Sequence, residues 1–105
     1  MYSLDELIRL LVKALREPVA RNASIAQFQK FVWGGREPEV PSQIFDVLRE
    51  VAYDLDFFEL DPNVRKEDPS YYGHQRAEEE IRSALRKLKD AGAELPADLD
   101  VGAGP

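Results

Sequence analysis

The residues with the clearest chemical character lie between Glu37 and Tyr72. This stretch contains ten acidic and three basic residues, a net charge of −7, whereas the net charge of the whole chain is −6. Local negative charge steers basic partners toward a surface, and aromatic side chains act as anchors in protein interfaces. The stretch contains both, and therefore predicts a protein-binding surface. Its aromatic residues are Tyr53, Phe57, Phe58, Tyr71 and Tyr72.

We expect the contact surface to be made of ten rings and carboxylates: Tyr53, Asp54, Asp56, Phe57, Glu59, Asp61, Glu67, Asp68, Tyr71 and Tyr72. Two alternatives remain open, because a charge run is often only a solvated helix end, and the two tyrosines can instead pack onto the helix that follows. Carboxylates crowded near a helix C-terminus oppose the helix dipole. Adjacent phenylalanines also leave one ring facing away from the core. Both features favour a contact role.

Catalytic and metal-binding motifs are missing from the sequence. His74 is the single histidine, so a site with two histidine ligands is excluded, and there is no phosphate-binding glycine loop. The acidic run after Asp54 lacks the central glycine of a calcium loop. We therefore expect no catalysis, no metal and no cofactor. A small enzyme that uses paired carboxylates remains a third alternative, although the sequence marks no cleft for it.

Composition limits the setting in which the protein acts. A chain of 105 residues has the size of one domain, and it contains no cysteine, which suits a reducing cytoplasm. Its first residues do not have the basic and apolar pattern of a signal peptide, and no apolar run approaches the ~20 residues of a membrane span. The negative net charge opposes binding to nucleic acid phosphates. We expect a cytoplasmic protein that binds neither membranes nor nucleic acid directly.

Apolar residues at helical spacing predict two helices in the first third of the chain. A capping-box pattern, serine followed three residues later by glutamate or glutamine, starts these helices at Ser3 and at Ser24. Pro18 ends the first helix, and the Gly34–Gly35 pair ends the second. Trp33, at the end of the second helix, is expected in the core.

Two further helices are predicted in the rest of the chain. One begins near Ser42 and extends to about Asp56 or Phe58, and the other extends from about His74 to Ala91. The segment 61–73 between them reads as a long connection with two prolines. No segment alternates as a strand does.

Together these segments predict an all-α fold, an antiparallel four-helix bundle. We expect the bundle to occupy residues 1–92, with Gly92 as the cap of the last helix, and residues 93–105 to form a flexible tail. The residues expected in the core are Leu4, Leu7, Leu11, Phe28, Phe45, Leu48, Ile81 and Leu88.

The layout resembles that of the colicin-D-type bacterial immunity proteins over about residues 4–90. The matching segments are Ser24-Ile25-Ala26-Gln27-Phe28, Ile44-Phe45-Asp46-Val47-Leu48, Asp54-Leu55-Asp56, Asp61-Pro62 and Glu79-Glu80-Ile81-Arg82. The resemblance implies a small cytoplasmic four-helix bundle that neutralises a toxic, tRNA-cleaving nuclease. In that family, an acidic surface occupies the basic substrate cleft of the toxin.

Carried over to this chain, the resemblance implies that Asp54, Asp56, Glu59 and Asp61 pair with lysine and arginine of the toxin, with Glu67 and Asp68 at the rim. The chain departs from the family pattern in the tail after Gly92 and in the basic pair Arg65-Lys66 inside the acidic stretch. The expected partner is thus a basic toxin or nuclease domain, bound by a monomer or weak dimer. The main alternative is a non-enzymatic helical interaction or scaffold module, such as a self-associating bundle or a small scaffold subunit.

Overall fold

Four long helices and one short helix form the described part of the protein. The computed structural model describes residues 3–34, 40–97 and 99. The long helices are α1 (Leu4–Arg16), α2 (Arg21–Val32), α3 (Ser42–Leu55) and α5 (His74–Asp90), and the short one is α4 (Pro62–Arg65). Within these residues the only β-type pairing is an isolated bridge between Phe58 and Tyr72. The prediction of an all-α fold with four main helices is confirmed.

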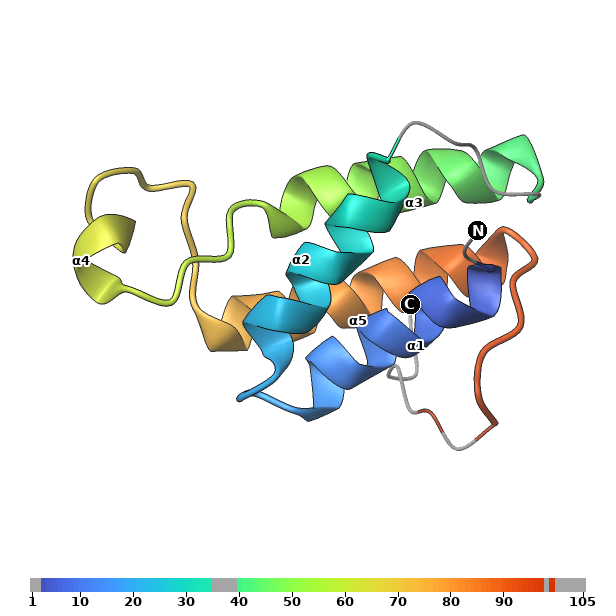
Figure 1. Ribbon diagram of the computed structural model, residues 1–105, viewed down its shortest axis with the longest axis horizontal. Helices are drawn as coiled ribbons and strands as arrows, with labels where there is room; N and C mark the ends of the chain where they lie inside the picture. The colour runs from blue at the N-terminus through green and yellow to red at the C-terminus, as the bar shows by residue number, and fades with distance from the viewer. Residues whose placement is uncertain (1–2, 35–39, 98, 100–105) are drawn as a thin grey trace.

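Each long helix packs against two others, so that α1, α2, α3 and α5 enclose one core. Figure 1 shows that α1 and α3 run in one direction along the long axis and that α5 runs in the opposite direction. Helix α2 crosses them obliquely, and α4 stands apart at one end of the molecule. The helices therefore form a compact body with one projecting end.

The core consists mainly of aliphatic side chains from all four long helices, together with a few aromatic rings. The buried aliphatic stripe of α1 faces α2 and α5, and a buried stripe at helical spacing is what periodicity predicts. The largest side chains buried without exposed surface include Leu7, Leu11, Phe28, Leu48, Ile81, Leu85 and Leu88. Burial of each such side chain contributes about 1.5–3 kcal/mol.

Three predicted core residues differ from expectation, the first being Leu4 at the start of α1, which is only partly buried against the core. Trp33 is 53% exposed at the C-terminal cap of α2, so its assignment to the core is wrong. The reason is its position, because α2 ends at Val32, which is the last buried residue of the helix, and Trp33 follows it at the exposed cap. Phe45 is only half-buried and lies under the guanidinium of Arg49 at the edge of α3, with 5.9 Å between the Arg49 Cζ atom and the ring centroid.

The start of α1 is as predicted, and the start of α2 is not. Ser3 Oγ accepts a hydrogen bond from the Glu6 backbone N–H at 3.2 Å, which caps α1. Helix α2 begins at Arg21, one turn before the predicted cap at Ser24, and Ser24 is buried inside the helix. A tight turn after Pro18 restarts the helix early, since the Arg21 backbone N–H already donates to the Pro18 carbonyl at 3.3 Å.

The segment after α3 is more ordered than the predicted connection. Helix α3 has Pro41 at its cap position, Ser42 as its first residue, and its last residue at Leu55. The short helix α4 was not predicted. Asp61 caps it by accepting from the Asn63 backbone N–H at 2.8 Å, and Pro62 occupies its first position, where a missing N–H is harmless.

Gly92 ends α5 as predicted, with a positive φ of 107°. The backbone N–H of Ala93 donates to the Leu88 carbonyl at 2.9 Å and that of Gly92 to the Lys89 carbonyl at 3.0 Å, the two bonds of a Schellman motif. The predicted flexible tail covers residues 93–105, of which 98 and 100–105 lie outside the described residues. Ala93 is buried and Leu95 packs partly on the core, so the core continues past Gly92.

Candidate functional site

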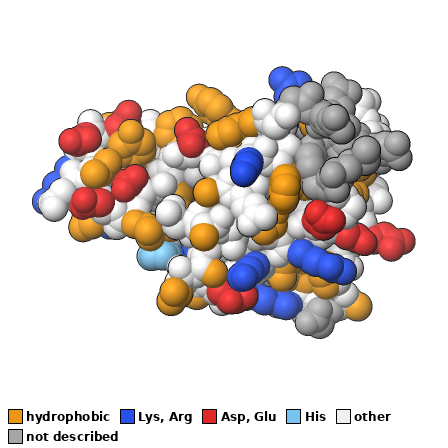
Figure 2. Space-filling view, in the orientation of Figure 1, with side chains coloured by type: hydrophobic (Ala, Val, Ile, Leu, Met, Phe, Trp, Pro, Cys, Tyr) orange, Lys and Arg blue, Asp and Glu red, His pale blue; other side chains and the backbone are white. Residues whose placement is uncertain are grey.

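The predicted contact residues lie at the projecting end of the molecule. We call residues 53–72, the last turn of α3 and the excursion of the chain that contains α4, the acidic end. Figure 2 shows acidic side chains gathered over this end, with hydrophobic side chains between them. Glu37 and Glu39 belong to the same charged stretch of the sequence but lie outside the described residues.

Two rings of the acidic end form a pair at the surface. Tyr53 and Phe57 pack edge to face, with ring centroids 5.5 Å apart and planes at 77°. Tyr53 is 63% exposed and Phe57 is half-buried, whereas the next residue, Phe58, is buried. Phe58 lies past the end of α3, where the chain bends back toward the core. The two adjacent phenylalanines thus have different environments, as their adjacency predicts.

Tyr72 closes the base of the excursion. Its backbone N–H donates to the Phe57 carbonyl at 3.0 Å, and its carbonyl accepts from the Glu59 N–H at 2.9 Å. Its ring is buried, and its hydroxyl donates to the Asp54 carbonyl at 2.6 Å. Burial and the nearby charges of Glu80 and Asp54 raise the pKa of the Tyr72 hydroxyl. These contacts fit packing onto the body better than contact with a partner. Tyr71 beside it is half-buried.

Asp54 and Asp56 lie on opposite edges of α3. Asp54 lines a small cavity with residues of α5, whereas Asp56 Oδ1 accepts from Gln29 Nε2 of α2 at 3.3 Å. The same Gln29 nitrogen donates to the Ala52 carbonyl at 3.1 Å, which ties α2 to the end of α3. The two carboxylates are therefore directed toward different helices instead of forming one cluster.

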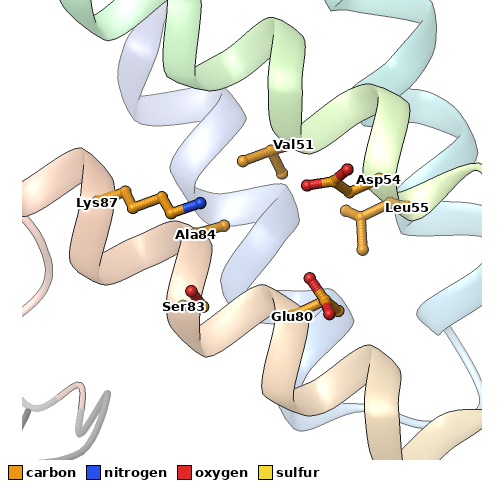
Figure 3. A pocket seen from close by; sticks show the side chains of 7 residues that line it. All are labelled: Val51, Asp54, Leu55, Glu80, Ser83, Ala84 and Lys87. Atoms are coloured by element: carbon orange, nitrogen blue, oxygen red, sulfur yellow. The ribbon is translucent and has the colours of Figure 1, made fainter.

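The cavity between α3 and α5 contains charged groups of both signs. Figure 3 shows Asp54 on α3 and Glu80 and Lys87 on α5 directed into the same narrow gap. Its volume is about 10 Å³, which is enough for roughly one water molecule. Burial, followed by the charges of Glu80 and Glu50, raises the pKa of the Asp54 carboxyl above its usual value of 3.8, although Lys87 opposes this. The gap is too small for a substrate.

The remaining carboxylates of the acidic end shape the chain locally. Glu59 Oε1 accepts from the Asp61 backbone N–H at 3.2 Å, and Asp68 Oδ1 accepts from the Ser70 N–H at 2.8 Å. Glu67 is exposed. Among the described residues, the salt bridges involve Glu50, Glu78 and Glu80, and none involves a carboxylate between Asp54 and Asp68. The negative charge of this end is thus not neutralised by ion pairs within the described chain.

The basic pair inside the acidic end is divided between two roles. Arg65 turns back toward the body, where its Nη1 donates to the Glu59 carbonyl at 2.8 Å. Its guanidinium lies over Gly73, since a Cβ added there would be 2.9 Å from Nη1. Lys66 is exposed. Arg65 therefore holds the excursion together and lines an open hollow of about 410 Å³ with His74 and Arg76 at the start of α5.

A buried arginine is the polar residue that sequence reasoning missed. Arg21 has no exposed surface, and its guanidinium donates from Nε to the Ala14 carbonyl at 2.6 Å and from Nη2 to the Leu15 carbonyl at 3.0 Å. Nη1 lies 2.8 Å from His74 Nδ1, and Nη2 lies 3.7 Å from Glu78 Oε1. Because an arginine can only donate, Nδ1 of the histidine must accept. An arginine at a helix start carries no sequence signal for this role.

The described residues contain no group of three or more potential metal ligands. None of the helices within them is both long enough and apolar enough to cross a membrane. The ring of His74, the single histidine, packs edge to face on Phe58 at 5.3 Å.

Comparison of the chain with protein-family models, with curated proteins and with solved structures found no match.

Proposed function

We propose that this protein is an immunity protein that binds and inhibits a basic bacterial toxin, an RNA-cleaving nuclease, by covering its active-site cleft with the acidic end. The observation that carries the proposal is the set of six carboxylates between Asp54 and Asp68, which have no ion pair within the described chain. Uncompensated charge of one sign accelerates the encounter with a partner of the opposite sign. The exposed ring of Tyr53 supplies an anchor that slows dissociation.

The proposal includes the setting and the finer architecture. We infer that the four long helices are an antiparallel four-helix bundle with an oblique second helix, in keeping with the resemblance to the colicin-D-type immunity proteins. The protein acts in the cytoplasm as a monomer or weak dimer, without a cofactor and without catalysis of its own. Its role is to occupy the place of the RNA phosphates.

The test uses the product of the neighbouring reading frame, if that frame ends in a basic nuclease domain. The purified domain is mixed with this protein, and tRNA cleavage and association rate are measured at increasing ionic strength. We expect inhibition, together with an association rate that falls as salt rises. A scaffold module that associates with itself through an apolar face would respond little to salt and would leave cleavage unchanged.

Two double charge reversals separate a specific surface from net charge alone. Asp56→Lys with Glu59→Lys should weaken binding by about 2–5 kcal/mol if both groups are buried at the interface. Asp90→Lys with Glu94→Lys is the control, because these two residues are exposed at the other end of α5. Both variants change the net charge equally. Equal loss of binding in both, or no loss in the first, would remove the acidic end from the mechanism.

A further inference from the structure

The outward face of α3 carries a row of side chains at four-residue spacing. Phe45, Arg49, Tyr53 and Phe57 follow one another along this row, the last of them just past the end of the helix. Residues four apart lie on the same face of a helix. The structure gives two contacts within the row, Arg49 over Phe45 and Tyr53 against Phe57, which join its members in two pairs.

The row already binds one guanidinium at its first ring. The Arg49 Cζ atom lies 5.9 Å from the centroid of Phe45, within the range of a cation–π contact. Among residues 3–34, 40–97 and 99, the cation–π contacts are at Phe45 and Tyr72, and none is at Tyr53, the most exposed ring of the row. The π surface of Tyr53 is therefore accessible to a partner.

Two acidic residues close to Tyr53 in the sequence lie toward opposite edges of α3. Asp54 lies on the α5 edge of α3 and Asp56 on the α2 edge, and neither forms an ion pair within the part of the chain that the structure describes. Asp56 is exposed and lies about one turn along the chain from Tyr53, whereas the Asp54 carboxylate is directed into the narrow gap beside α5. An exposed ring with a carboxylate one turn away matches a side chain with an apolar stem and a planar cationic head.

We propose that the outward face of α3 is an arginine-binding surface, on which an arginine of a basic protein partner stacks on Tyr53 and reaches Asp56 with its guanidinium. The inference rests on the proposed function for the basic character of the partner and adds the residue type that this surface selects. Arginine fits better than lysine because its planar fork stacks on rings and binds carboxylates bidentately. A second copy of this chain fits poorly, because it would bring the same carboxylates together.

The test compares two labelled peptides of equal length and charge, one of Arg-Gly repeats and one of Lys-Gly repeats. Binding is measured by fluorescence anisotropy at low salt, and the contact surface is mapped by amide chemical-shift changes. We expect the arginine peptide to bind about tenfold more tightly than the lysine peptide. The shift changes should centre on Tyr53 and extend along α3.

Three substitutions isolate the contribution of the ring. Tyr53→Leu keeps an apolar side chain on an exposed helical position but removes the π surface, so the preference for arginine should fall to about the level of no preference. Tyr53→Phe should retain the preference, because the π surface remains. Trp33→Leu removes another exposed ring, at the C-terminal cap of α2 and outside the predicted contact surface, so it is the control and should also retain the preference. Circular dichroism checks that all three variants keep the helical fold.

The possible results separate this inference from the proposed function. Equal binding of both peptides, or an arginine preference that survives Tyr53→Leu or disappears with Trp33→Leu, would overturn the arginine surface on α3. In those cases, inhibition of the toxin that is lost on charge reversal at Asp56 and Glu59 would leave the immunity function standing. Conversely, an arginine preference that depends on Tyr53 would support the surface even if the nuclease were not inhibited.

Discussion

Replacement of Arg21 by methionine tests how much a buried cation contributes to this fold. Methionine has a similar length and fills most of the same volume, but it donates no hydrogen bonds. In the native protein the guanidinium satisfies the carbonyls of Ala14 and Leu15 at the C-terminus of α1, and it also contacts His74 and Glu78 on α5. The variant would leave all four groups without this donor.

The size of the effect follows from two opposing terms. An unsatisfied buried carbonyl costs about 1–3 kcal/mol, and there are two of them at the end of α1. Removal of the guanidinium also ends the penalty of burying a charge, which can exceed the attraction between the charges. We expect a net destabilisation of about 2–4 kcal/mol for Arg21→Met, a large share of the 5–15 kcal/mol typical of a whole domain.

Urea denaturation followed by circular dichroism measures this difference through the midpoint, provided that the slope is unchanged. Arg82→Met is the matched control, because Arg82 is exposed on α5, and its effect should stay within about 0.5 kcal/mol. The stability of Arg21→Lys should lie between those of the wild type and Arg21→Met, because one ammonium can replace only some of the hydrogen bonds that the guanidinium donates. If Arg21→Met were as stable as the wild type, the free-energy cost of burying the charge would equal or exceed the gain from its hydrogen bonds. The claim that Arg21 stabilises the fold by bonding to the last carbonyls of α1 would then be wrong.

Two further predictions concern Asp54, at the end of α3, and Tyr72, whose hydroxyl bonds to the Asp54 carbonyl. The pKa of Asp54 is higher in the folded protein than in the unfolded chain, so the protonated carboxyl stabilises the fold. This stabilisation is fully present at pH values below the pKa of the unfolded chain, and it is lost as the pH rises through the pKa of the folded protein. Asp54→Asn should therefore be slightly more stable than the wild type at about pH 7, with a gain that disappears near pH 4 in urea titrations. Tyr72→Phe removes the hydrogen bond to the Asp54 carbonyl and should lose about 1 kcal/mol at neutral pH. The pKa of Tyr72 is also raised in the folded protein, so the wild type should lose stability as the pH rises above 10.0, the usual pKa of tyrosine. The difference in stability between the wild type and Tyr72→Phe should therefore shrink when denaturation is measured in alkaline buffer. A difference that stays constant with pH would contradict this explanation.

The helical architecture could be read from the sequence because local and global signals agree. Apolar stripes at helical spacing predicted α1, α3 and α5, and Ser3 and Gly92 marked two helix ends where the structure has a side-chain cap and a Schellman motif. The start of α2 was missed because serine at a cap and serine inside a helix look alike in sequence. A turn that depends on the tertiary position of Arg21 decided between them.

The candidate site was predictable in composition and not in geometry. The sequence located the acidic end, but it could not show that Asp54 and Asp56, two residues apart, face different helices. Nor could it show that Tyr72 is buried while Tyr53 is exposed, because a pairing between Phe58 and Tyr72 decides this and joins residues far apart in the chain. Such contacts leave no local pattern. Helix α4 was missed for a different reason, since four residues are too few to show periodicity.

The pairing of Phe58 with Tyr72 has a consequence for variation among proteins of this type. This pairing holds the two ends of residues 59–71 close together, so that these residues form an Ω-loop. The tip of the loop is α4, which has no buried residue. Substitutions or changes of length at the tip would leave the hydrophobic core untouched. Sequence changes at the tip could therefore alter which partner is bound without lowering the stability of the fold, while the pairing of Phe58 with Tyr72 keeps the loop in place.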